Sequence, residues 1–150
     1  MAKTWTKEMK LLVDLSPGTH LWLPVATAEI INPGVMVTWT SNELVEVDAA
    51  SDDATIIGVA NGSSAVGETD KIQVVTKGIF QATVVSGTYT IGAGLKYDDS
   101  ADDGSLVADG DANSIAWAWD YGTTVTTLKV YFDIVLIGAV AGKMFDISSA

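Results

Sequence analysis

The side chains that most often carry out catalysis are scarce in this chain. His20 is its single histidine, and its 150 residues include no cysteine and no arginine. His20 lies in an expected turn near Asp14, Ser16 and Thr19, but this local spacing does not bring a nucleophile and an orienting acid to opposite sides of a base. The Gly-x-Ser-x-Gly sequence of a nucleophile elbow is also absent. We predict no catalytic residue and no enzyme activity.

One acidic segment carries the oxygen ligands that a metal ion needs. Residues 98–104 read Asp-Asp-Ser-Ala-Asp-Asp-Gly. A helix-loop-helix calcium site has oxygen ligands at its first, third and fifth positions and glycine at its sixth. Counting from Asp98 places Asp103 at the sixth position, and counting from Asp99 places Ala101 at the third. Because both registers fail, we predict a solvated hairpin loop with no metal ion and no cofactor.

The charge of the chain argues against nucleic acid as a partner. The formal net charge is −11, and residues 1–10 hold three lysines against one glutamate. The remaining residues hold five lysines against 18 carboxylates. Nucleic-acid binding depends on clustered lysine and arginine side chains that displace counterions from phosphates. We predict no direct contact with nucleic acid. A membrane partner is not expected either, because the apolar run at residues 134–141 is too short to span one.

Short strand signals separated by turns dominate the chain. β-branched and aromatic residues form short runs bounded by glycine, proline, asparagine or aspartate. Strands at this spacing are typical of sandwiches and barrels. We predict an all-β fold, a small β-barrel or sandwich of short antiparallel strands with an extended N-terminal arm. The expected strands cover residues 25–31, 35–40, 44–47, 56–60, 71–76, 79–85, 95–97, 114–120 and 124–138.

Local turn signals predict two hairpins. Residues 35–40 pair with 44–47, and residues 71–76 pair with 79–85 across a turn at Lys77-Gly78. One domain is expected from the length. We divide the chain into an N-terminal arm or lead-in, a β-barrel or sandwich domain and a C-terminal tail, at residues 1–24, 25–142 and 143–150.

The lead-in has two readings. Trp5, Met9 and Leu12 recur at roughly helical spacing, whereas residues 11–15 also suit a strand. Ser16-Pro17-Gly18 then forms a turn. Both helix and strand remain open for this segment.

Six glycine-marked or strand segments follow one another in a fixed order. They are Asn32-Pro33-Gly34, residues 56–60, residues 72–80, residues 92–98, Gly104-Ser105-Leu106 and residues 114–118. In this order the chain resembles head-decoration proteins of the lambda-like type. These are the capsid cement proteins of tailed double-stranded DNA phages. The resemblance covers about residues 28–137.

The resemblance implies a β-rich protein that is made in the host cytoplasm and assembles as a homotrimer. Such trimers sit on the outer surface of the virion capsid and clamp neighbouring subunits of the major capsid protein against internal DNA pressure. The implied partners are therefore the major capsid protein and further copies of this chain. An alternative is a carbohydrate-binding or adhesive β module on a virion or cell surface.

Apolar residues near the N-terminus are the candidates for capsid contact. They are Trp5, Leu11, Leu12 and Trp22. An arm of this kind would add as a strand to a sheet edge of the capsid protein and place its apolar side chains in pockets. For Trp5 and Trp22, simple packing within the chain remains an equal alternative.

A second set of aromatic residues follows a strand period. Trp117, Trp119 and Tyr121 share one face of the expected strand because alternate residues point to the same side. Three roles remain open for this stripe: core packing, a subunit interface, or a platform on which a sugar stacks. We take the three residues as candidates for the oligomer interface.

Overall fold

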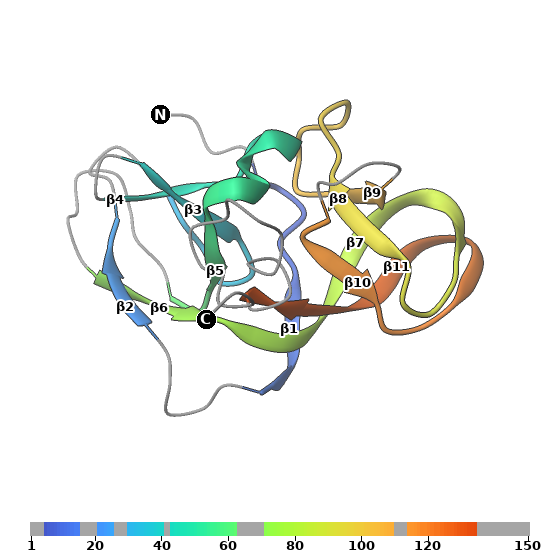
Figure 1. Cartoon of the computed structure of the whole chain (residues 1–150), viewed down its shortest axis with the longest axis horizontal. Coiled ribbons are helices and arrows are strands. Elements are labelled where there is room, and N and C mark those ends of the chain that lie inside the picture. The colour runs from blue at the N-terminus through green and yellow to red at the C-terminus, as the bar shows by residue number, and fades with distance from the viewer. Residues whose placement is uncertain are drawn as a thin grey trace, which may run out of the picture.

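The computed structural model describes residues 5–15, 21–25, 30–40, 43–62, 71–109 and 114–134. These residues form eleven strands and one 3-10 helix, η1 (Ala50–Thr55), and within them there is no α-helical element (Figure 1). The predicted all-β fold is confirmed. No described helix is long and apolar enough to cross a membrane.

Six strands build the first sheet, and five of them close on themselves. The sheet order is β1 (Lys10–Asp14), β7 (Lys77–Tyr89), β11 (Gly122–Asp133), β10 (Ala116–Ala118), β8 (Gly94–Tyr97) and β9 (Leu106–Ala108). A parallel pairing of Val84 with Leu106 returns β9 to β7 and closes a small barrel. β1 is added to the opposite side of β7 as an edge strand.

Five strands build the second sheet. Their order is β2 (Leu21–Pro24), β6 (Lys71–Val75), β5 (Ile56–Ala60), β3 (Met36–Thr40) and β4 (Glu43–Glu46). The predicted pairing of residues 35–40 with 44–47 is confirmed, because β3 and β4 are antiparallel neighbours. A parallel bridge between Val25 and Leu44 brings the two outer strands together.

The predicted hairpin around Lys77-Gly78 is wrong. β6 pairs with β2 and β5, whereas β7 pairs with β1 and β11, so only Thr76 separates two strands that belong to different sheets. Gly78 allows a close approach in place of a turn: a Cβ on Gly78 would lie 2.9 Å from the carbonyl oxygen of Val13 in β1. The chain thus runs almost without interruption from one sheet into the other.

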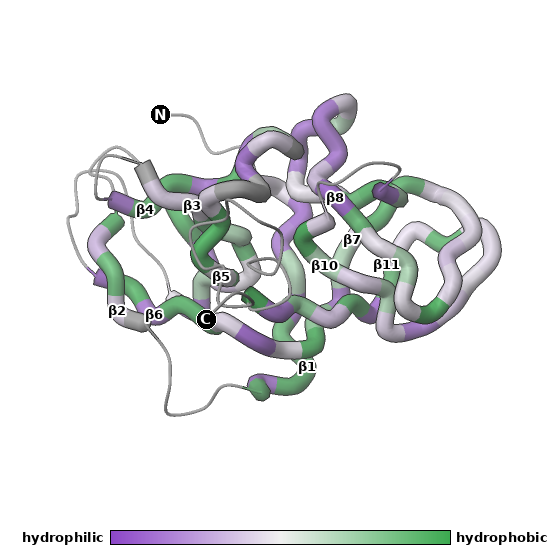
Figure 2. Tube along the Cα trace, in the orientation of Figure 1, coloured by the Kyte–Doolittle hydropathy of each residue, from purple (hydrophilic) through white to green (hydrophobic). Residues whose placement is uncertain are grey.

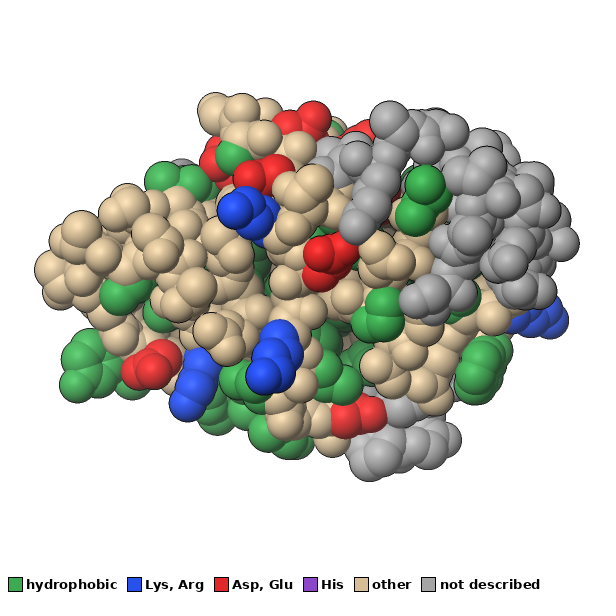
Figure 3. Space-filling view, turned by 180° about the vertical axis from the view of Figure 1, so that it is seen from behind, with side chains coloured by type: hydrophobic (Ala, Val, Ile, Leu, Met, Phe, Trp, Pro, Cys, Tyr) green, Lys and Arg blue, Asp and Glu red, His purple; other side chains and the backbone are tan. Residues whose placement is uncertain are grey.

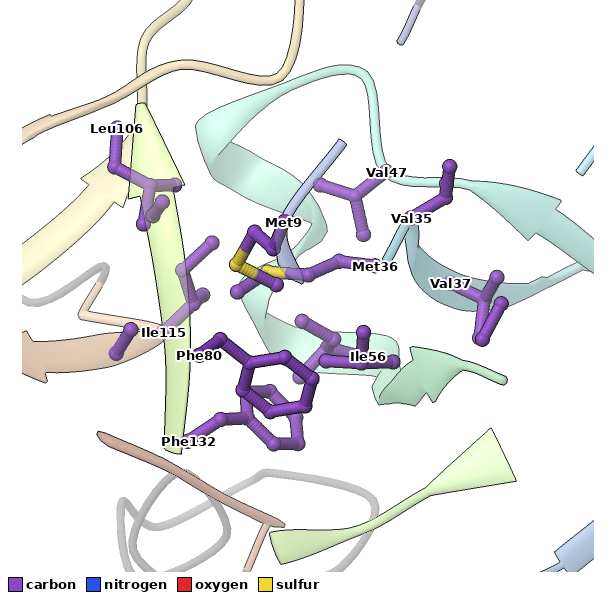
Figure 4. Close-up of a cluster of buried hydrophobic side chains, with 14 of the residues drawn as sticks. Met9, Val35, Met36, Val37, Val47, Ile56, Phe80, Leu106, Ile115 and Phe132 are labelled. Carbon is purple, nitrogen blue, oxygen red and sulfur yellow. The ribbon is translucent and has the colours of Figure 1, made fainter. Parts of the chain in front are cut away.

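The core lies where the two sheets meet. The rings of Phe80 and Phe132 pack edge to face, with centroids 6.5 Å apart. Met9 from the N-terminal segment and Met36 from β3 point toward one another beside them (Figure 4). β5 is buried over its whole length, and the hydrophobic colour gathers there (Figure 2).

Most of the other expected strands coincide with β5, β6, β8, β10 and β11. The sequence missed β2 and the three-residue strand β9, and β7 is longer than expected. The expected strand at residues 25–31 and the predicted tail at 143–150 fall mostly or wholly outside the described residues.

Candidate interaction surfaces

The N-terminal segment is part of the folded body. Trp5 is fully buried, and its indole N–H donates a hydrogen bond to the carbonyl oxygen of Val47, with 2.6 Å between the heavy atoms. Its backbone N–H donates to a carboxylate oxygen of Glu46, and its ring centroid lies 5.9 Å from that of Tyr97. Of the two alternatives for Trp5, the structure shows packing. Trp5 therefore joins β8 of the barrel to the end of β4.

The segment that follows is a strand with an apolar surface. β1 settles the open choice between helix and strand at residues 10–14. Leu11 is half-buried against the core, while Leu12, Val13 and Leu15 are 38%, 45% and 42% exposed. A bulge between Leu11 and Val13 makes the pairing with β7 irregular at Leu12. Hydrophobic side chains gather on the surface over β1, along the lower rim of Figure 3.

Trp22 lies on a different surface. Its backbone pairs with Gln73 at the β2 edge of the second sheet, and its side chain is 60% exposed. The structure therefore brings Leu11 and Leu12 together on β1 but places Trp22 on the other sheet. His20 lies outside the described residues.

The aromatic stripe predicted from strand parity lies on the outer face of the barrel. Trp117 is half-buried and pairs across strands with Tyr131, while Trp119 is exposed with its ring centroid 5.4 Å from that of Tyr131. Tyr121 lies beyond the end of β10 and is 74% exposed. The Tyr131 hydroxyl donates to a carboxylate oxygen of Asp133 at 2.7 Å. Burial, followed by this hydrogen bond, raises the pKa of Tyr131 to about 12.

A shallow depression of about 280 Å³ borders this stripe. Its lining comes from β7, from β11 and from the loop before β11: Gln81, Asp120, Tyr121, Val125, Thr127, Leu128 and Lys129. The sequence analysis missed the contributions of Gln81 and Lys129. These two residues pair across strands although 48 positions separate them in the chain, so no local pattern reveals them.

The acidic loop is organised by its own hydrogen bonds. Asp103 accepts hydrogen bonds from the backbone N–H and the hydroxyl of Ser105, at 3.0 and 2.6 Å. The hydroxyl hydrogen bond lowers the pKa of Asp103. Tyr97 donates its hydroxyl to Asp102 at 2.7 Å, and Asp98 accepts from the backbone N–H of Ser100. Across the described part of the chain, no three acidic or histidine side chains are grouped in a way that could hold a metal ion. These carboxylates stabilise turns.

Comparison with known proteins identifies a structural neighbour. No family model matches the chain, and no curated protein matches its sequence. Among solved structures, the fold matches the crystal structure of the head fiber gp8.5 N base in bacteriophage phi29, with a TM-score of 0.52. The match covers 76% of this chain and 94% of that chain at 10% sequence identity. The two chains therefore share a fold, and the arrangement of two small sheets described above is one that occurs in a phage head fiber.

Proposed function

We propose that this chain is a structural protein of a phage virion that binds the outer capsid surface as a homotrimer and cements neighbouring major capsid subunits. The observation that supports this proposal most directly is the shared fold with the base of a phage head fiber, which extends over nearly all of that chain. The order of glycine-marked segments, which resembles decoration proteins, points to the same class independently.

β1 is the proposed contact with the capsid. It is an edge strand of its sheet, so its outer main-chain groups face away from β7. Strand addition pairs such an edge with an extended segment of a partner, and exposed apolar side chains then enter pockets on that partner. Leu12, Val13 and Leu15 supply those side chains. Trp5 is not part of this surface because its side chain is buried.

A modest contact of this kind is sufficient when many copies bind together. Each copy of a trimer engages its own capsid subunit, so the second and third contacts form at a high effective concentration. The trimer thereby resists detachment more strongly than any single β1 contact. No chemical step is needed for this role.

Co-sedimentation with capsid shells tests the proposal. Wild-type chain is mixed with expanded shells, and separately with procapsids, assembled from the major capsid protein encoded by the same phage. We expect binding to the expanded shells and loss of that binding in Leu12→Asp, because a carboxylate cannot enter an apolar pocket. Ser51→Asp is the matched control, since Ser51 is exposed on η1, away from β1. Equal binding of Leu12→Asp and wild type would exclude β1 as the contact.

The outer face of the barrel supports a second candidate function, glycan binding. Trp119 is 51% exposed and is braced by Tyr131, next to a depression that presents amide, carboxylate, hydroxyl and ammonium groups. Exposed aromatic rings beside polar groups suit a sugar ring, which has apolar faces and polar edges. Titration with neutral oligosaccharides tests this function: binding that disappears in Trp119→Ala but persists in Trp22→Ala would favour it.

A further inference from the structure

Two of the uncharged segments of this acidic chain pair with each other in the fold. They are residues 78–95 and residues 121–128, a total of 26 positions. Charged residues make up 18% of the chain, so about five would be expected at this many positions. Threonine, serine, glycine, valine and aromatic residues fill them instead. Other uncharged runs occur at residues 15–28, 30–42 and 54–67, and residues 78–95 are the longest of these runs.

The fold joins the two segments into one surface. β7 and β11 pair from Thr83 with Thr127 to Tyr89 with Gly122, at the end of the barrel that lies farthest from the second sheet (Figure 1). We call this surface, residues 82–92 and 121–128, the uncharged ribbon. Its tube is mostly pale in Figure 2, and the corresponding end of the molecule, on the left of Figure 3, is almost free of acidic and basic side chains.

The uncharged ribbon exposes three large apolar or aromatic side chains. Val85, Ile91 and Tyr121 are 39%, 66% and 74% exposed. From Gly122 to Thr127, every residue of β11 is exposed or half-buried, whereas Ala82, Val84 and Tyr89 of β7 are buried in the core. The exposed side chains of the ribbon stay in contact with water in a monomer. Another molecule that covers it would therefore stabilise it.

The composition of the ribbon matches the centre of a protein interface. Interface centres lose charged residues and gain aromatic ones, whereas the surrounding rim stays polar. Here Asp120 and Lys129 stand directly at the two ends of residues 121–128, Tyr121 supplies an exposed aromatic ring, and Trp119 lies just outside the ribbon.

We propose that the uncharged ribbon is the surface through which copies of this chain contact one another. Copies that each carry a net charge of −11 repel, and a contact that opposes their carboxylates costs free energy. The uncharged ribbon brings two copies together without placing carboxylates face to face. The inference rests on the proposed function, which requires the chain to assemble, and it specifies where the copies meet. It also keeps the copy contact separate from β1, which stays available for the capsid.

A single added charge on the ribbon tests this inference. Thr126 is an exposed residue of β11 in the uncharged ribbon. We expect wild type and Thr126→Ser to form a defined oligomer by light scattering and native mass spectrometry. We expect Thr126→Asp to dissociate to the 15.7 kDa monomer, with at least a tenfold higher dissociation constant. Ser51→Asp, which adds the same charge outside the ribbon, should leave the oligomer intact. Circular dichroism and thermal unfolding confirm that each variant is folded.

The outcomes separate the inference from the proposed function. If Thr126→Asp stays fully oligomeric while Leu12→Asp loses capsid binding, the inference is wrong and the proposed function stands. If wild type neither oligomerises nor binds shells, both are wrong. If wild type is monomeric and binds neutral oligosaccharides in a way that Thr126→Asp abolishes, the ribbon is a glycan surface and the inference is overturned.

Discussion

Replacing Trp5 by phenylalanine tests whether the N-terminal segment holds the two sheets together. Phenylalanine retains an aromatic ring against Tyr97 but removes the indole N–H that donates to Val47. A buried carbonyl that loses its donor costs about 1 to 3 kcal/mol. The atoms lost from a fully buried site add about 1 to 2 kcal/mol. We therefore expect Trp5→Phe to lower the free energy of unfolding by about 2 to 5 kcal/mol.

The assay is urea and thermal unfolding followed by circular dichroism. For a chain of this size, each kcal/mol shifts the Tm by about 2 to 4 °C, so the Tm should fall by roughly 4 to 20 °C. Trp22→Phe is the matched control, because Trp22 is 60% exposed and such surface changes cost about 0.5 kcal/mol or less. Equal stability of the two variants would refute the conclusion that the Trp5 contacts hold the two sheets together.

Three further predictions concern local structure and pH. Gly104→Ala should destabilise the fold by at least about 1 kcal/mol in thermal unfolding, because Gly104 has φ of +98° and a Cβ there would lie 2.4 Å from the Trp5 ring. Alkaline unfolding should depend on Tyr131, because its pKa is about 12 in the folded chain against 10.0 for an ordinary tyrosine. The stability that it contributes is therefore full below pH 10 and is lost toward pH 12. In Tyr131→Phe this loss should disappear from stability measured against pH. Acid unfolding should depend on Asp103, because its pKa in the folded chain is below the ordinary 3.8. The stability that Asp103 contributes is present above that pH and is lost as the pH falls. Ser105→Ala should therefore move the midpoint of acid unfolding to higher pH.

The positions of most strands follow from local sequence, and their partners do not. Alternating β-branched residues between turn signals are sufficient to place β3, β4, β5 and β8. The same signals misassigned Lys77-Gly78 as a turn, because a glycine needed for close approach to Val13 looks the same in sequence as a glycine needed for a turn. Barrel closure by Val84 and Leu106 depends on a parallel contact between distant residues, which no local pattern encodes.

The candidate surfaces were predictable to a similar extent. Strand parity correctly places Trp117 and Trp119 on one face, but their contact with Tyr131 arises only from the pairing of β10 with β11. Hydrophobicity alone cannot tell the buried Trp5 from the exposed Trp22, since the difference depends on a partner 42 residues away in the chain. The sequence shows several uncharged segments, and only the β7–β11 ladder merges two of them into one surface.

The length of β7, which pairs with β1 near its start and carries the uncharged ribbon farther along, has a mechanical consequence. β1 pairs with Gly78 to Gln81, and the uncharged ribbon begins at Ala82 on the same strand. Under the proposed function, a pull exerted by a capsid subunit at β1 and by a sister copy at the ribbon would pass from β1 into β7 through their strand pairing and then along the β7 backbone. The neighbouring β11 lies antiparallel to β7 along most of that path. Such a load would act as shear, parallel to the strands, and would strain many hydrogen bonds at once instead of breaking them one after another.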